Sequence, residues 1–320
     1  MLKIFRNNVV FQIVVILVVS IVMWSKAWVN PVGDFPEGGG SLFYWITGLM
    51  SPRVAAIVAW LLVIGEGVLL NSIMYQHRLI TQSTLLPLLL YVVAMSSGTL
   101  TLTPMMVGML FVLLGLQCFF LMGSQVTVSI DKIFGASASI GMAILLCPTM
   151  AVMVIPLVAC MFSHSLYGWR DWTMLVLGLA APFILIETYY FVCDELFYRN
   201  YLLVYALRDY SWHARGGLAS GVISGVFVIL LLWGVLYVAG GGQSHSLSWN
   251  RNVTTVLLFA VGGVLHSAYT GIWPVDMQAL SVPFACCTGM LLAEPRRKEF
   301  GMNAVFVVTV LLFAVVNWVI

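Results

Sequence analysis

The stretch FGASASIGMAILLCPTMAVMVIPLV, residues 134–158, decides how the rest of this chain can be arranged. It belongs to an apolar run from Phe134 to Phe162 that is long for one membrane helix and short for two. Pro148 lies in the middle of this run, and a proline inside a helix removes a backbone hydrogen bond and clashes with the preceding turn. We therefore predict a hairpin of two short helices over residues 134–162.

The composition places this hairpin in a membrane. The chain has 320 residues, of which 62% are hydrophobic and 8% are charged. A soluble domain carries about 25% charged residues, so no soluble core could bury this much apolar surface. The first apolar run, Val9 to Trp24, lacks a small-x-small cleavage site and continues into bulky residues. It is interpreted as a retained first helix rather than a signal peptide.

The fold class predicted is all-α, a polytopic integral membrane helical bundle with about nine to eleven membrane segments. Residues 1–320 form a single transmembrane domain in this prediction, and the segment SLFYWITGLM, residues 41–50, is too short to span and is typical of an interfacial helix. Outside the hairpin, helices are expected at residues 9–29, 54–75, 84–100, 104–123, 172–192, 218–239, 253–272, 278–293 and 300–320.

The distribution of basic residues favours a cytoplasmic N-terminus in a bacterial inner membrane. With the hairpin counted as two segments, the cytoplasmic side holds nine of the fourteen lysines and arginines, including the triplet at residues 296–298. Counting residues 134–162 as one span would place that triplet outside. The same orientation makes residues 30–53 the first outer loop and residues 193–216 an outer amphipathic segment.

Several classes of function are disfavoured by the residues present. The six cysteines form no CxxC pair and no metal-ligand spacing, so a zinc site and disulfides are not expected. No metal and no cofactor is predicted. The net charge is +2 and the basic residues are scattered or lie at helix ends, so no nucleic-acid partner is expected.

Three polar side chains are predicted inside the membrane: Glu66, Glu187 and His266. A charge at the bilayer centre costs at least about 2.5 kcal/mol, so such residues usually face a cavity or a partner. Structural hydrogen bonding is one interpretation, with Asn71 or Ser72 as candidate partners of Glu66. A transporter, with the two glutamates as proton or ion sites, is the other.

The sequence DELFYR, residues 194–199, resembles the first motif of CAAX-type intramembrane proteases, in which a glutamate and two membrane histidines activate water. The remaining motifs of that family do not match. Gly262 and Thr270 stand four residues on either side of His266, where the family has other residue types. Residues 193–216 are also predicted to lie outside the membrane, so the protease is a minor alternative.

The whole chain resembles a family of polytopic membrane proteins of the Bacteroidota that is known only as a domain of unknown function. The resemblance is carried by residues 69–93, 134–158, 169–191 and 280–300. It implies a polytopic membrane fold but no activity.

The hairpin, the basic loop after it and the helix containing GLAAPF, residues 178–183, also resemble GT-C type glycosyltransferases that use polyprenyl-phosphate sugars. That resemblance implies a catalytic acid in the first outer loop, here Asp34 or Glu37, which would deprotonate an acceptor hydroxyl. Arg199, Arg208 and Arg215 would bind the lipid phosphate. The loop has no Asp-Asp or Asp-x-Asp pair. A degenerate relative, or a non-enzymatic subunit of a cell-envelope complex with a membrane-protein partner, is therefore the alternative.

Overall fold

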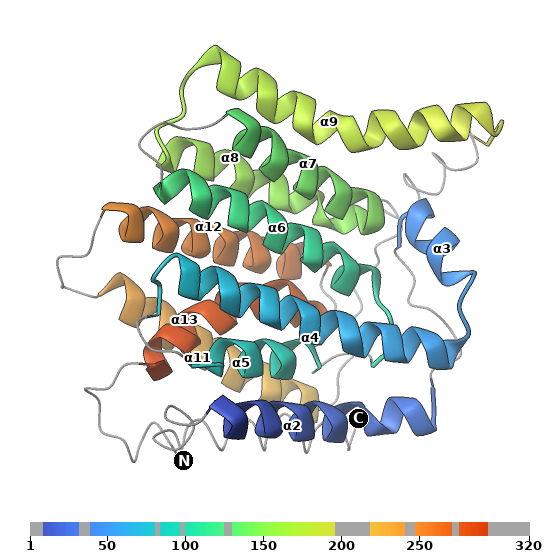
Figure 1. Ribbon diagram of the computed structural model, residues 1–320, viewed down its shortest axis with the longest axis vertical. Coiled ribbons are helices and arrows are strands. Elements are labelled where there is room, and N and C mark those ends of the chain that lie inside the picture. The colour runs from blue at the N-terminus through green and yellow to red at the C-terminus, as the bar shows by residue number, and fades with distance from the viewer. Residues whose placement is uncertain are drawn as a thin grey trace.

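A computed structural model describes residues 9–31, 39–80, 84–96, 100–124, 130–195, 218–240, 247–270 and 275–293. All regular elements in these ranges are helices (Figure 1). In chain order they are α2 (Val9–Val29), α3 (Ser41–Thr47), α4 (Pro52–Gln76), α5 (Leu86–Met95), α6 (Pro104–Ser124), α7 (Ile130–Leu146), the 3-10 helix η1 (Pro148–Met153), α8 (Val154–Ser163), α9 (Trp169–Val192), α11 (Leu218–Ala239), α12 (Leu247–Thr270), the 3-10 helix η2 (Val275–Leu280) and α13 (Ser281–Ala293).

Five of these helices, α2, α4, α6, α9 and α12, are long and apolar enough to cross a membrane. A bilayer core offers no hydrogen-bond partner to an exposed backbone, so spanning segments must satisfy their own backbone groups as helices. The predicted all-α, polytopic fold is confirmed, and the protein is an integral membrane protein. The predicted helix at residues 300–320 lies outside the described residues.

The directions of α7 and α9 confirm the hairpin predicted around Pro148. A Cβ on Gly178 of α9 would meet the Phe134 carbonyl oxygen at 2.7 Å, and one on Gly141 of α7 would meet the Leu179 carbonyl oxygen at 2.7 Å. Residue numbers rise together along this contact, so α7 and α9 run parallel. The segment between them, η1 and α8, must therefore carry the chain back, and the reversal begins at Pro148.

Two short helices, α5 and α13, form the centre of the bundle, and every residue in both is buried. The predicted helix at residues 84–100 is shorter in the structure because α5 ends at Met95. There the Gln278 side-chain amide donates to the Met95 carbonyl oxygen at 3.3 Å. The Thr103 hydroxyl donates to the Oε1 oxygen of the same Gln278 side chain at 3.2 Å, so Gln278 links the end of α5 to the start of α6.

The outer surface of the bundle is apolar, as expected for a surface in contact with lipid. Figure 1 shows α9 along one edge of the bundle and α2 along the opposite edge. On α9, Leu185 is 74% exposed and Val192 is 78% exposed. Exposing these apolar side chains to water would cost free energy, and contact with lipid avoids that cost.

One end of the bundle, which we call the α3 end, is where α3 lies (Figure 1). The contacts between neighbouring helices give the direction of each helix. They show that this end holds the C-terminal ends of α2, α7, α9 and α12 and the N-terminal ends of α4 and α6. The segment predicted as an interfacial helix at residues 41–50 forms α3, with Trp45 56% exposed.

Candidate functional site

The first loop of the chain rejoins the bundle at Gly40, which docks on the last turn of α7. The Gly40 amide donates a hydrogen bond to the Leu146 carbonyl oxygen at 2.9 Å. A Cβ at position 40 would overlap the Leu145 carbonyl oxygen, so only glycine permits this approach. One residue later, the Ser41 and Tyr190 hydroxyl oxygens lie 2.8 Å apart in a buried contact. The start of α3 is therefore held to the ends of both α7 and α9.

A buried polar chain lies beside this docking point. The Cys147 sulfur is 3.1 Å from the Thr149 hydroxyl oxygen, which is 3.1 Å from Nε2 of His266 on α12. Cys147 directly follows Leu146, whose carbonyl receives the Gly40 amide. The His266 side chain is only 1% exposed, and its second ring nitrogen, Nδ1, has no hydrogen-bond partner in the described part of the chain. The site therefore contains a buried imidazole with one polar atom that no described residue pairs with.

The predicted catalytic acids Asp34 and Glu37, and the predicted phosphate-binding residues Arg199, Arg208 and Arg215, all lie outside the described residues. The structure does describe the points where their segments join the bundle. The loop with the two acids ends at Gly40 and Ser41, and the segment with the three arginines begins after α9. The Ser41–Tyr190 contact holds these two points together.

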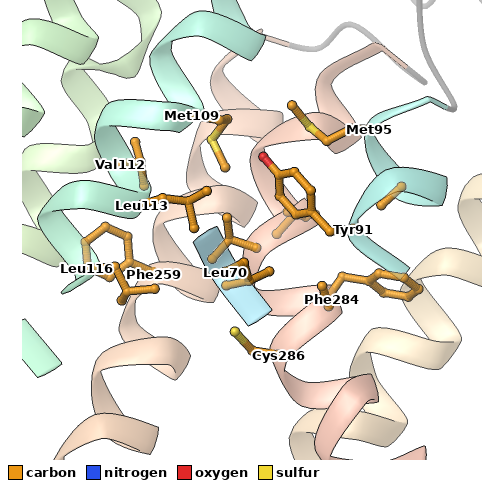
Figure 2. Close-up of a cluster of buried hydrophobic side chains, with 14 of the residues drawn as sticks. Leu70, Tyr91, Met95, Met109, Val112, Leu113, Leu116, Phe259, Phe284 and Cys286 are labelled. Atoms are coloured by element: carbon orange, nitrogen blue, oxygen red, sulfur yellow. The ribbon is translucent and has the colours of Figure 1, made fainter. Parts of the chain in front are cut away.

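Glu66 lies in the middle of α4, and its side chain is completely buried. The Tyr91 hydroxyl of α5 donates to its Oε2 at 2.9 Å. Its Oε1 has no hydrogen-bond partner among the described residues. Asn71 and Ser72, the candidate partners suggested by the sequence, are not its partners here. Figure 2 shows Tyr91 among apolar side chains, including Leu70, Met95 and Met109.

Glu187 lies nearer to the C-terminal end of α9 than to its middle. Glu187 is half-buried and stands five residues before the last residue of α9, about 8 Å along the axis. The helix stops at Val192. Asp194 then adopts a left-handed conformation (φ 58°), and the Glu195 amide donates to the Tyr190 carbonyl oxygen at 3.0 Å. The acidic pair of the protease-like motif thus follows a helix end, as predicted.

The opposite end of the bundle holds a second buried histidine, His164, one residue beyond α8. Its Nε2 is 3.1 Å from the Thr255 hydroxyl oxygen, and its side chain is 4% exposed. Burial, with a smaller contribution from the positive charge of Arg251, lowers the pKa of His164 from 6.5 to about 4.

Stability is expected to fall as the pH is lowered from 6.5 towards 4, because the unfolded chain then binds a proton that the folded His164 does not. The folded protein keeps the full contribution of His164 to its stability above pH 6.5. Within this window it loses up to about 1.4 kcal/mol of unfolding free energy for each pH unit that the pH falls. Thermal unfolding in detergent at pH 7.5 and pH 4.5 measures the effect. In His164→Gln, which keeps a polar group for Thr255 but cannot titrate, the difference between the two pH values should shrink. An unchanged difference would assign the pH effect to other groups.

Several residues that make these contacts were not predicted from the sequence, although one of them could have been. Tyr91 is the only polar side chain in the apolar helix LPLLLYVVAM, and a buried tyrosine hydroxyl usually needs a partner. That requirement could have paired it with Glu66. Ser41, Thr149 and Tyr190 carried no such signal, because their partners come from distant parts of the chain.

No family model matches this chain, and no curated protein matches it. The resemblances to the Bacteroidota family and to the GT-C glycosyltransferases therefore stay predictions. Among the residues that the structure describes, no three His, Cys, Asp or Glu side chains are gathered closely enough to hold a metal ion.

Proposed function

We propose that this membrane protein transfers a sugar from a polyprenyl-phosphate carrier to an acceptor hydroxyl at the α3 end of the bundle. The observation that supports this most is the contact between Ser41 and Tyr190. Glu37 precedes Ser41 by four residues, and Arg199 follows Tyr190 by nine. Chain connectivity keeps their Cα atoms within about 14 Å and about 32 Å of those anchors. An acid and a phosphate-binding arginine can therefore share one site.

We also propose that the α3 end faces the outside of a bacterial inner membrane. Four basic residues of the described ranges lie at the opposite end, at the end of α4 and near the starts of α7, α9 and α12: Arg78, Lys132, Arg170 and Arg251. Only Lys26 and Arg53 of the described basic residues lie near the α3 end. Excess positive charge favours the cytoplasmic side, which supports this orientation.

The proposed reaction needs a base and a phosphate-binding group at this end. Asp34 or Glu37 takes the proton from the acceptor hydroxyl as its oxygen attacks the anomeric carbon of the sugar. The bond between that carbon and the phosphate oxygen breaks, and the polyprenyl phosphate leaves with the bonding electrons. Arginines from the segment after α9 would stabilise the negative charge on the leaving phosphate.

In the test, the purified protein in nanodiscs is given a panel of polyprenyl-phosphate-linked hexoses together with envelope-derived acceptors. Release of polyprenyl phosphate is followed by mass spectrometry. Either Asp34→Asn or Glu37→Gln is expected to lower the rate about 100-fold or more, because general-base catalysis contributes at least about that factor. Asp171→Asn is the matched control: Asp171 caps the start of α9 at the opposite end and should leave the rate unchanged.

Two outcomes would contradict this function. Absence of transfer with every donor, together with a membrane protein that stably co-purifies, would favour the non-enzymatic subunit. Peptide hydrolysis that is lost in Glu195→Gln, and unaffected in Asp34→Asn and Glu37→Gln, would favour the protease.

A further inference from the structure

Nδ1 of His266 has no hydrogen-bond partner among the described residues, and the hydrogen-bonded neighbours of the ring indicate whether this nitrogen is a donor or an acceptor. A neutral imidazole has one protonated and one unprotonated nitrogen. Thr149 has a single hydroxyl proton and two neighbours that could accept it, the Cys147 sulfur and the His266 Nε2. A ring nitrogen is a stronger acceptor than a thiol sulfur. The hydroxyl proton is therefore assigned to the bond with Nε2, which leaves the imidazole proton on Nδ1.

The Nδ1–H of His266 is thus a buried donor with no partner among the described residues. Leaving a buried donor without a hydrogen bond costs about 1–3 kcal/mol. A ligand oxygen that accepts this bond would recover that cost. An anionic oxygen would recover more, since charge-assisted hydrogen bonds are roughly twice as strong as neutral ones.

The location of this donor matches the proposed site. Its partner Thr149 is three residues beyond Leu146, whose carbonyl oxygen receives the Gly40 amide. The loop that bears Asp34 and Glu37 therefore returns to the bundle within a few residues of the group that orients His266. The imidazole lies four residues before the end of α12, so it is at the α3 end of the bundle rather than at its centre.

We propose that His266 binds a phosphate oxygen of the polyprenyl-phosphate ligand through Nδ1–H, with Thr149 holding the imidazole in the required tautomer. The assignment rests on the proposed function for the lipid carrier, but the phosphate chemistry can be tested without any transfer reaction.

The test uses two substitutions that separate the ring nitrogens. In His266→Asn, the short amide can place a donor at the Nδ1 position. In His266→Gln, the longer amide reaches the Nε2 position beside Thr149 and leaves the Nδ1 position empty. Affinity for a long-chain polyprenyl phosphate is measured in nanodiscs, with parallel titrations of inorganic phosphate and of vesicles containing phosphatidylglycerol. We expect His266→Gln to weaken polyprenyl-phosphate binding about tenfold or more, and His266→Asn to weaken it less.

His164 provides the matched control, because its Nε2 makes the same 3.1 Å contact with a threonine at the opposite end of the bundle. His164→Gln and His164→Asn should leave polyprenyl-phosphate binding unchanged. Binding of inorganic phosphate with the same dependence on His266 would mean that the site recognises phosphate without its lipid. Equal binding of phosphatidylglycerol would mean that it recognises a general lipid headgroup.

Nitrogen NMR of the wild-type imidazole gives a readout that does not depend on variant folding. The Nδ1 signal should show a protonated nitrogen and should shift when polyprenyl phosphate is added. A proton on Nε2, or weaker binding in His266→Asn than in His266→Gln, would overturn the proposal. Binding that depends on His266 in a protein without transfer activity would refute the enzyme and keep the phosphate site. Transfer activity that is unaffected in His266→Gln would refute the phosphate site at His266 and keep the enzyme.

Discussion

Replacing Gly40 with alanine is expected to detach the start of α3 from the end of α7. The new Cβ would overlap the Leu145 carbonyl oxygen, a backbone atom that cannot move aside as a flexible side chain could. The hydrogen bond from the Gly40 amide to Leu146 would break, at a cost of about 1–3 kcal/mol. If the first loop supplies the catalytic base, transfer activity should also be lost, because the loop would no longer be held at the site.

The measurement is thermal unfolding in detergent, combined with a double-mutant cycle that uses Ser41→Ala. In the wild-type protein, Ser41→Ala removes the hydroxyl contact with Tyr190 and should lower stability. In the Gly40→Ala background it should have little further effect, because the contact is already lost. Gly65→Ala is the control: no atom lies within 4 Å of its Cβ position, and alanine at this exposed site in α4 should be neutral or slightly stabilising. Two additive substitutions would show that Gly40 and Ser41 do not act through one docking contact.

Replacing Tyr91 with phenylalanine is expected to destabilise the centre of the bundle. The phenol donates the hydrogen bond to Oε2 of Glu66, and the carboxyl is completely buried, so Tyr91→Phe leaves it without this partner. The expected loss in the free energy of unfolding is about 1–3 kcal/mol. Glu66→Gln keeps an acceptor for the Tyr91 hydroxyl and should cost less. Unfolding in mixed micelles by titration with a denaturing detergent measures both.

The double variant Tyr91→Phe with Glu66→Leu separates structure from function at this position. Removing both polar partners of a buried hydrogen bond can be nearly neutral, so the double variant should be more stable than Tyr91→Phe alone. The transporter hypothesis predicts a different pattern. In that case Glu66→Gln would abolish activity while changing stability little, since the carboxyl would be needed to bind a proton or an ion.

Much of the fold could be predicted because lipid restricts the choices of the chain. Long apolar runs must be helices in a bilayer, so residues 9–29 and the helix containing Glu66 could be located to within a few residues. Pro148 predicted the hairpin for a local reason, the hydrogen bond that proline cannot make. The early end of α5 could not be predicted, because the Met95 carbonyl is bonded by Gln278, a residue distant in sequence.

The candidate site was predictable only in part, since its residues come from separate segments. The sequence placed Glu66 and His266 in the membrane because a polar residue in an apolar helix is conspicuous. It could not identify Tyr91 or Thr149 as their partners, because a pairing between helices depends on how those helices pack.

By itself the sequence determined that this protein is a bundle of membrane helices with a proline-broken hairpin, because apolar length and proline geometry act locally. Only the tertiary structure decided that α7 and α9 run parallel, with Gly141 and Gly178 permitting the close approach. It also decided that Gly40 and Ser41 dock on the ends of α7 and α9, and that Thr149 pairs with His266. These contacts join residues that are far apart in the chain, and no local propensity encodes them.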